Sequence, residues 1–109
     1  MKVLEQAGHY SAPGDEPSHW IEHLRVSDLS VGTYSIPAGG VDDQTPHTED
    51  EIYVVARGRA RLESDDGSAE VGPGSVLYVP AAQRHRFVDV TADLAVIVFF
   101  APAEYSRGS

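Results

Sequence analysis

Apolar and polar residues alternate over short stretches of this chain, and residues that form turns separate the stretches. Alternation with a period of two is typical of β-strands that have one buried face. No stretch repeats its apolar residues at the spacing of an amphipathic helix. The pattern therefore predicts an all-β protein with strands over residues 20–26, 29–36, 52–56, 60–63, 76–79, 86–90 and 94–100.

Turn-forming residues set the boundaries of these strands. The Asp-Asp-Gly sequence at 65–67 predicts a hairpin turn, and Gly-Pro-Gly at 72–74 predicts a second turn. Pro-Ala-Gly-Gly at 37–40 ends one strand, and Arg-Gly at 57–58 kinks another. Many short strands divided in this way predict an antiparallel sandwich or barrel, because closing the sheet protects its edge strands.

The two ends of the chain differ in composition from its middle. Residues 1–18 are rich in residues that form turns and loops, which predicts a loosely held arm, although residues 1–4 could instead add a short edge strand. Residues 102–109 are predicted to be a tail. With 109 residues in all, the chain is expected to form one domain, with its barrel over about residues 19–101.

Charge and composition narrow the classes of function. The net charge of −9 would repel a phosphate backbone, so a nucleic acid partner is not expected. The chain has no cysteine, which excludes disulfides and thiolate metal sites. The longest apolar stretch, residues 94–101, is too short to cross a membrane, and the first residues lack the apolar run of a signal peptide. We therefore expect a cytoplasmic protein that does not enter membranes.

An acidic segment with one histidine precedes the strand predicted at residues 52–56. His47, Glu49 and Glu51 are spaced two apart, so on an extended chain they lie on one face. A divalent metal bound there would favour ionised carboxylates and a neutral imidazole. Without a metal the segment would be a solvated acidic loop, and these residues alone do not decide between the two interpretations.

A second histidine lies at the start of a later strand. His85, Phe87 and Asp89 share one face of it. A single histidine that points inward is more often a hydrogen-bonded core residue than a metal ligand. With His47 and Glu51 on a facing strand, however, His85 would complete a set of two histidines and one carboxylate, which leaves metal positions open for water or substrate.

The spacing of these residues resembles the two sequence motifs of the small single-domain cupins. The first cupin motif runs Gly, five residues, His-x-His, three or four residues, Glu, six residues, Gly, and its positions here hold Gly39, Thr45, His47, Glu51 and Gly58. The second runs Gly, five residues, Pro-x-Gly, two residues, His, three residues, Asn, and its positions here hold Gly74, Pro80, Ala82, His85 and Asp89. The resemblance covers about residues 29–100.

This resemblance implies an antiparallel jelly-roll β-barrel with a metal centre inside it. His47, Glu51 and His85 would then be the ligands of one divalent transition metal, and iron, manganese, nickel and zinc all suit such a set. The resemblance also implies a small-molecule ligand and a homodimer, which the predicted strand over residues 20–26 could form through its edge.

One departure from the cupin pattern bears on the metal. Thr45 stands where the family has its first histidine, and threonine is a poor ligand for a divalent metal. Water could fill the position, Gln44 could reach in through its amide oxygen, or the site could bind metal weakly or not at all. Glu49, on the same face as His47, is a further candidate for an additional ligand or for a supporting residue.

Aromatic residues near the predicted ligands are candidates for the pocket. Tyr53 follows Glu51 by two residues, so its side chain should face the same interior. We predict it as the hydrogen-bond donor or general acid, although a packed core tyrosine would show the same pattern. Tyr34, Tyr78 and Phe87 are predicted to line the pocket with it.

Three classes of function fit these residues. The favoured one is a metalloenzyme that acts on a small oxygenated organic molecule by dioxygenase, isomerase or lyase chemistry. A non-catalytic module that binds or senses a small ligand is the second, and a structural barrel with a degenerate metal site is the third.

His9, His19 and His23 lack ligand spacing to the two motifs and are assigned to surface or packing roles.

Overall fold

Strands occupy most of the chain between residues 19 and 101 in the computed structural model, which describes residues 1–106. They are β1 (His19–Arg25), β2 (Ser30–Ile36), β3 (Asp50–Ser64), β4 (Gly67–Val71), β5 (Val76–Val79) and β6 (His85–Ala101). The described residues contain no helix that could cross a membrane. The all-β prediction is confirmed, and the hairpin turn predicted at residues 65–67 joins β3 to β4.

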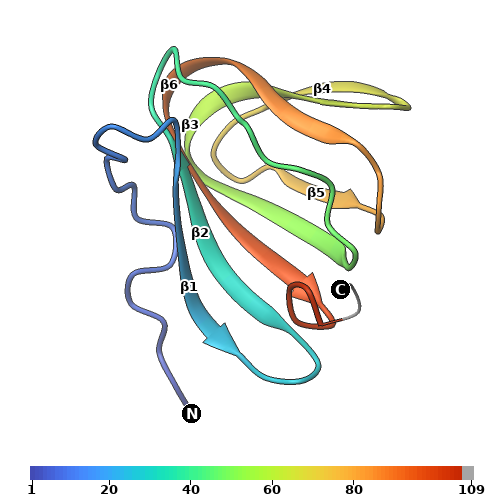
Figure 1. The fold of residues 1–109 in the computed structure, drawn as a ribbon. Coiled ribbons are helices and arrows are strands. Elements are labelled where there is room, and N and C mark those ends of the chain that lie inside the picture. The colour runs from blue at the N-terminus through green and yellow to red at the C-terminus, as the bar shows by residue number, and fades with distance from the viewer. Residues whose placement is uncertain (107–109) are drawn as a thin grey trace.

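The strands form one antiparallel sheet that curls over on itself (Figure 1). Their order is β1-β2-β6-β3-β4, and β5 pairs with β3 beside this path. β3 and β6 pair with each other along their whole length, from Asp50 opposite Ala101 to Ser64 opposite His85. The predicted jelly-roll barrel is confirmed by this arrangement.

A bend in the middle of β3 and β6 curls the sheet. The pairing between the two strands shifts register three times between Val55 and Arg61. Gly58 lies in this stretch with a φ of +95°, a left-handed conformation that favours glycine. The sequence predicted two strands on either side of residues 57–58, whereas the structure has one bent strand, because its pairing with β6 resumes beyond the bend.

We expect Gly58→Ala to lower the free energy of unfolding by about 3 kcal/mol. A Cβ there would meet the Asp93 carbonyl oxygen and lie 2.7 Å from Leu94 Cα, and moving this backbone would disturb the pairing of β3 with β6. Gly39→Ala is the matched control, because Gly39 has a φ of +74° but an added Cβ would have no atom within 4 Å. Only backbone strain, about 1 kcal/mol, is expected from the control. Urea unfolding measures both, and equal losses would contradict the steric explanation.

Alternate residues of β3 and β6 point into the barrel and form its core. Tyr53 and Val55 of β3 pack with Leu94, Val96 and Val98 of β6, and each of the five is at most 2% exposed. The same alternation carries Glu51 inward, two residues before Tyr53. A buried carboxylate is costly unless hydrogen bonds or a cation satisfy it. Because the register of β3 turns Glu51 inward, its carboxylate needs positive charge beside it inside the barrel.

The N-terminal arm covers the outer face of β2. The Gly8 amide donates to Thr33 Oγ1 at 2.9 Å, and the Ser11 amide donates to Ser35 Oγ at 3.1 Å. With the core on its inner face and the arm on its outer face, every residue of β2 is buried. The prediction of a loosely held arm was therefore wrong for residues 8–11, and no strand forms at residues 1–4.

Residues 102–106, here called the C-terminal segment, pack onto the barrel although they were predicted as a tail. Ala103 is only 3% exposed. The Glu104 amide donates to Ser30 Oγ at 2.8 Å, and the Glu104 carbonyl oxygen accepts from Arg25 Nη1 at 2.9 Å. The remaining part of the predicted tail, residues 107–109, lies outside the described residues.

Candidate metal centre

His47, Glu51 and His85 converge inside the barrel. One potential ligand atom from each lies within 4.8 Å of the others, and all three residues are buried. His47 belongs to the loop before β3, Glu51 to the start of β3 and His85 to the start of β6. Although His85 pairs with Ser64 at the far end of β3, the bend at residues 55–61 returns it to Glu51. The three residues predicted as ligands are therefore brought together by the closure of the sheet.

Glu51 lies between the two imidazoles. Its Oε1 is 3.1 Å from His85 Nε2 and 3.5 Å from His47 Nδ1. Two buried atoms of this group, His47 Nδ1 and Glu51 Oε2, have no hydrogen-bond partner among the described residues. Buried polar atoms are rarely left without partners, so these two atoms would be satisfied by an ion bound between the three residues. Two imidazoles and a carboxylate are suitable donors for a divalent transition metal, and the residues fit such an ion.

In each imidazole, the nitrogen that faces away from Glu51 already makes a hydrogen bond. His85 Nδ1 lies 2.8 Å from the Gln83 carbonyl oxygen, to which it donates, and this leaves Nε2 facing Glu51. His47 Nε2 lies 2.9 Å from Glu104 Oε2 and donates to it, which leaves Nδ1 facing Glu51. Such hydrogen bonds fix the orientation of a metal-binding histidine and select which nitrogen carries the lone pair.

In the metal-free protein, protons on His47 and His85 balance the negative charge of Glu51. Burial by itself would lower the pKa of His47, but hydrogen bonds to Glu104 and Glu51 outweigh burial and raise it to about 9. The pKa of His85 is raised in the same sense, because its contact with Glu51 outweighs burial. Burial would raise the pKa of Glu51, but the two histidines lower it. A divalent cation would supply the positive charge that these protons supply in its absence.

Tyr53 directs its hydroxyl toward the same group. The hydroxyl lies 2.8 Å from His85 Nε2 and 3.3 Å from Gln44 Oε1. Burial, followed by the charges of Glu51 and Asp42, raises the pKa of Tyr53 well above its ordinary value. The phenol is therefore neutral at physiological pH and can donate a hydrogen bond.

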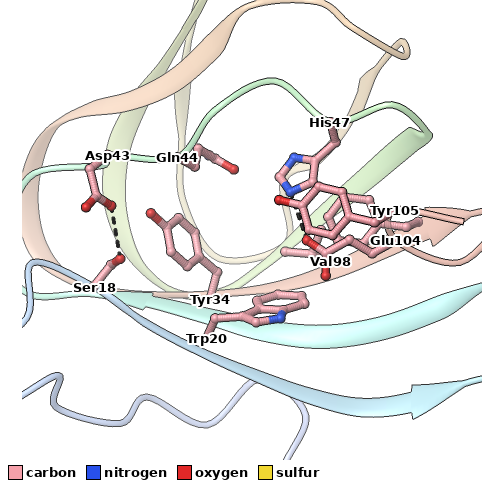
Figure 2. Close-up of a pocket in the computed structure, with 10 residues that line it drawn as sticks. Ser18, Trp20, Tyr34, Asp43, Gln44, His47, Val98, Glu104 and Tyr105 are labelled. Atoms are coloured by element: carbon pink, nitrogen blue, oxygen red, sulfur yellow. Dashed lines mark hydrogen bonds and ion pairs between the residues drawn. The ribbon is translucent and has the colours of Figure 1, made fainter. Parts of the chain in front are cut away.

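A cavity of about 280 Å³ lies beside His47 and is largely apolar and aromatic (Figure 2). Its lining residues are Ser18, Trp20, Tyr34, Asp43, Gln44, His47, Val98, Phe100, Glu104 and Tyr105. No lysine or arginine is among these described residues. The volume suits a small organic molecule, and the aromatic rings can cover its apolar part.

Several predicted site residues lie elsewhere. Tyr78 is 60% exposed, so its prediction as a pocket residue was wrong, because the alternation of β5 turns its neighbours Leu77 and Val79 inward instead. Phe87 is buried behind Tyr53, with ring centroids 5.0 Å apart, and does not line the cavity. Tyr34 does line it, and its hydroxyl donates to Asp42 at 2.7 Å.

Thr45 stands where the cupin family has its first histidine, and the residues that could replace that ligand lie in different places. Thr45 is exposed and lies outside the three-residue group. Gln44 reaches the cavity and contacts Tyr53, and its amide Nε2 donates to Asp42 at 2.7 Å. Glu49 is fully buried but outside the group of potential ligands, and its Oε1 accepts from the Tyr105 amide at 2.6 Å. Glu49 therefore holds the C-terminal segment.

Glu104 is the site residue that sequence reasoning missed. Nothing in its local sequence distinguishes it from a solvated acid near a chain end. Asp42 also lay outside the predicted site residues, yet it is buried and its Oδ2 accepts from the Phe87 amide at 2.8 Å. His9, His19 and His23 stay apart from the metal centre, and His19 and His23 contact serine and threonine hydroxyls at 2.7 Å.

Comparison with known proteins gives a consistent assignment of the fold. The profile of the Cupin domain family (Cupin_2) matches residues 32–101. The uncharacterized protein SCO3923 of Streptomyces coelicolor is 42% identical over 85 residues, which cover 78% of this chain and 81% of that protein.

Solved structures show the same architecture at lower identity. KdgF from Halomonas sp. is 24% identical with a TM-score of 0.71, over 84% of this chain and 82% of that one. The DMSP lyase DddQ from Ruegeria pomeroyi is 17% identical with a TM-score of 0.73, over 92% of this chain but only 54% of that one. At these identities the likeness shows a shared fold.

Proposed function

Since this chain belongs to the cupin domain family, we propose that it binds one divalent transition metal through His47, Glu51 and His85 and acts as an enzyme on a small oxygenated organic molecule. The observation that carries the proposal is the buried group itself. It has two polar atoms without partners, His47 Nδ1 and Glu51 Oε2, and it lies next to a cavity of small-molecule size.

Two histidines and a carboxylate suit iron, manganese, nickel or zinc, and they leave coordination positions for substrate oxygens. When bound, such a metal supplies Lewis acidity or, if it is iron, the capacity for dioxygen chemistry. Dioxygenase, isomerase and lyase reactions are all forms of this proposal.

The protein's own groups would bind and protonate the substrate. Trp20 and Tyr34 would cover its apolar part and exclude water from the cavity. Once the Nε2 lone pair of His85 is used by the metal, the Tyr53 hydroxyl is free to donate to Gln44 or to a substrate oxygen. Its raised pKa keeps the proton on the phenol until a basic group forms on the substrate.

Tyr53→Phe should reduce turnover by about 100-fold or more while metal affinity changes by less than about 3-fold. The substitution removes one hydroxyl and keeps the ring that packs against Phe87. Tyr78→Phe is the matched control, because that tyrosine is exposed on β5. Initial rates and metal titrations of the two variants provide the measurement. If Tyr53→Phe keeps wild-type turnover, Tyr53 is only a packing residue.

A panel of β-dicarbonyl, enol and hydroxy-acid compounds tests catalysis by the metal-loaded protein. Oxygen consumption would identify a dioxygenase, whereas product formation without oxygen uptake would identify an isomerase or a lyase. Binding of the compounds without conversion would favour the alternative, a non-catalytic module that binds or senses a small ligand. A cytoplasmic location and a homodimer formed through the edge of β1 remain predictions, and light scattering of the purified protein tests the second.

A further inference from the structure

Glu104 reaches the metal centre from the C-terminal segment, outside both motifs. We propose that it is a positioning residue for the metal centre, whose carboxylate holds the Nε2–H of His47 and so turns Nδ1 toward the ion. This inference rests on the proposed metal site. It adds a residue outside both motifs, and it assigns which nitrogen of each histidine binds the metal.

The geometry separates the two nitrogens of His47. Nε2 lies 2.9 Å from Glu104 Oε2, whereas Nδ1 lies 3.5 Å from Glu51 Oε1 and has no hydrogen-bond partner. One imidazole cannot direct both nitrogens at the same ion. Glu104 therefore lies behind His47 as seen from the group formed by Glu51 and His85, and it is not one of the grouped potential ligands.

The backbone that carries the Glu104 carboxylate is held in place from several sides. The amide and carbonyl of Glu104 are bound by Ser30 and Arg25, and the next amide, that of Tyr105, is bound by Glu49. The Tyr105 ring stacks on His47 with centroids 5.3 Å apart and an interplanar angle of 27° (Figure 2). The Glu104 side chain is only 11% exposed, so water competes little for the hydrogen bond to His47.

The same contacts couple the C-terminal segment to the metal. An ion bound at Nδ1 makes Nε2–H of His47 a stronger donor to Glu104, and a docked segment presents the carboxylate that orients Nδ1. By linkage, each event must favour the other to the same extent. The metal-loaded protein should therefore show slower amide hydrogen exchange at Tyr105, whose amide binds Glu49.

Zinc titration in competition with a chelator tests the role of Glu104. Glu104→Ala should weaken zinc binding by about 10- to 100-fold. Glu104→Gln should weaken it less, because its amide oxygen can still accept from Nε2–H. Asp43→Asn is the charge control, since it removes a carboxylate from the rim of the same cavity, where Asp43 contacts Ser18 rather than His47, and it should change affinity by less than about 3-fold.

Histidine nitrogen NMR of the zinc-loaded protein gives a readout that is independent of affinity. His47 should carry its proton on Nε2 and zinc on Nδ1, and His85 the reverse, because it donates from Nδ1 to Gln83. Zinc on Nε2 of His47 would overturn the inference. Equal zinc affinities of wild type and the two Glu104 variants would also overturn it, as would equal losses in Asp43→Asn and Glu104→Ala.

These outcomes separate the inference from the proposed function. If wild type binds no zinc and no other divalent metal, the proposed metal centre fails and the role of Glu104 fails with it. If wild type binds zinc and Glu104→Ala binds it equally well, the metal centre stands and only the role of Glu104 is lost. If Glu104→Ala does not fold, Glu104→Gln and the nitrogen spectra of the wild type decide the question.

Discussion

Glu51→Gln should weaken binding of a divalent metal by about 100-fold or more. Glu51 is 2% exposed, its Oε1 faces both histidines and its Oε2 has no partner. Glutamine has nearly the same shape, so the barrel should keep its packing. It lacks the negative charge, however, and it can turn an amide N–H toward the ion. Isothermal titration with zinc, or competition with a chelator, measures the loss.

Glu63→Gln is the matched control for this variant, since Glu63 lies on the same strand but is about half exposed, forms an ion pair with Arg86 and does not belong to the metal group. Its metal affinity should equal that of wild type. Circular dichroism should show that both variants are folded. If Glu51→Gln bound metal as tightly as wild type, Glu51 would not be a ligand.

The metal-free protein should lose stability as the pH rises from about 6.5 to about 9. The pKa of His47 is raised from 6.5 to about 9 in the folded protein, because its bonds to Glu104 and Glu51 outweigh burial. The folded state therefore binds this proton more tightly than the unfolded state does, and the resulting stabilisation is complete below pH 6.5 and lost as the pH passes 9. The difference between these values sets an upper limit of about 3 kcal/mol. Urea unfolding in the presence of a chelator at a series of pH values measures the loss.

Two further observations check the origin of this pH dependence. His47→Gln should flatten the stability profile between pH 6.5 and 9, and an unchanged slope would assign it to another group. Metal affinity should rise over the same range, by up to about 10-fold per pH unit, because the ion competes with the proton on His47. At acid pH the sign reverses, since the lowered pKa of Glu51 gives a stabilisation that is lost as the pH falls below its ordinary value of 4.5.

Much of the fold could be predicted from local patterns. The period of two and the turn residues gave the strand positions of β1, β2 and β5 to within a residue. They did not show that β3 and β6 each continue through a bend, because the residues around Gly58 break the alternation locally while the pairing resumes beyond them. The prediction that the N-terminal arm is loosely held was also wrong for residues 8–11. Its hydrogen bonds to Thr33 and Ser35 depend on tertiary contacts that composition does not reveal.

For the candidate site too, the sequence predicted some residues and missed others. His47, Glu51 and His85 stand at positions of the two cupin motifs, so the resemblance to these motifs predicted them as ligands, and the structure places them together. Tyr78 was predicted to line the pocket, but the register of β5 faces its side chain outward. Glu104 could not be found from sequence, because its contact with His47 joins residues 57 positions apart.

Metal content after reconstitution tests the central claim most directly. The protein, purified without added metal, would be dialysed against iron(II), manganese, nickel and zinc in turn and then against metal-free buffer, and bound metal would be measured by mass spectrometry. Wild type should retain one equivalent of at least one metal per chain, and His85→Ala should retain almost none. Wild type free of all four metals, or a His85→Ala protein that retains a full equivalent, would contradict a metal centre built on His47, Glu51 and His85.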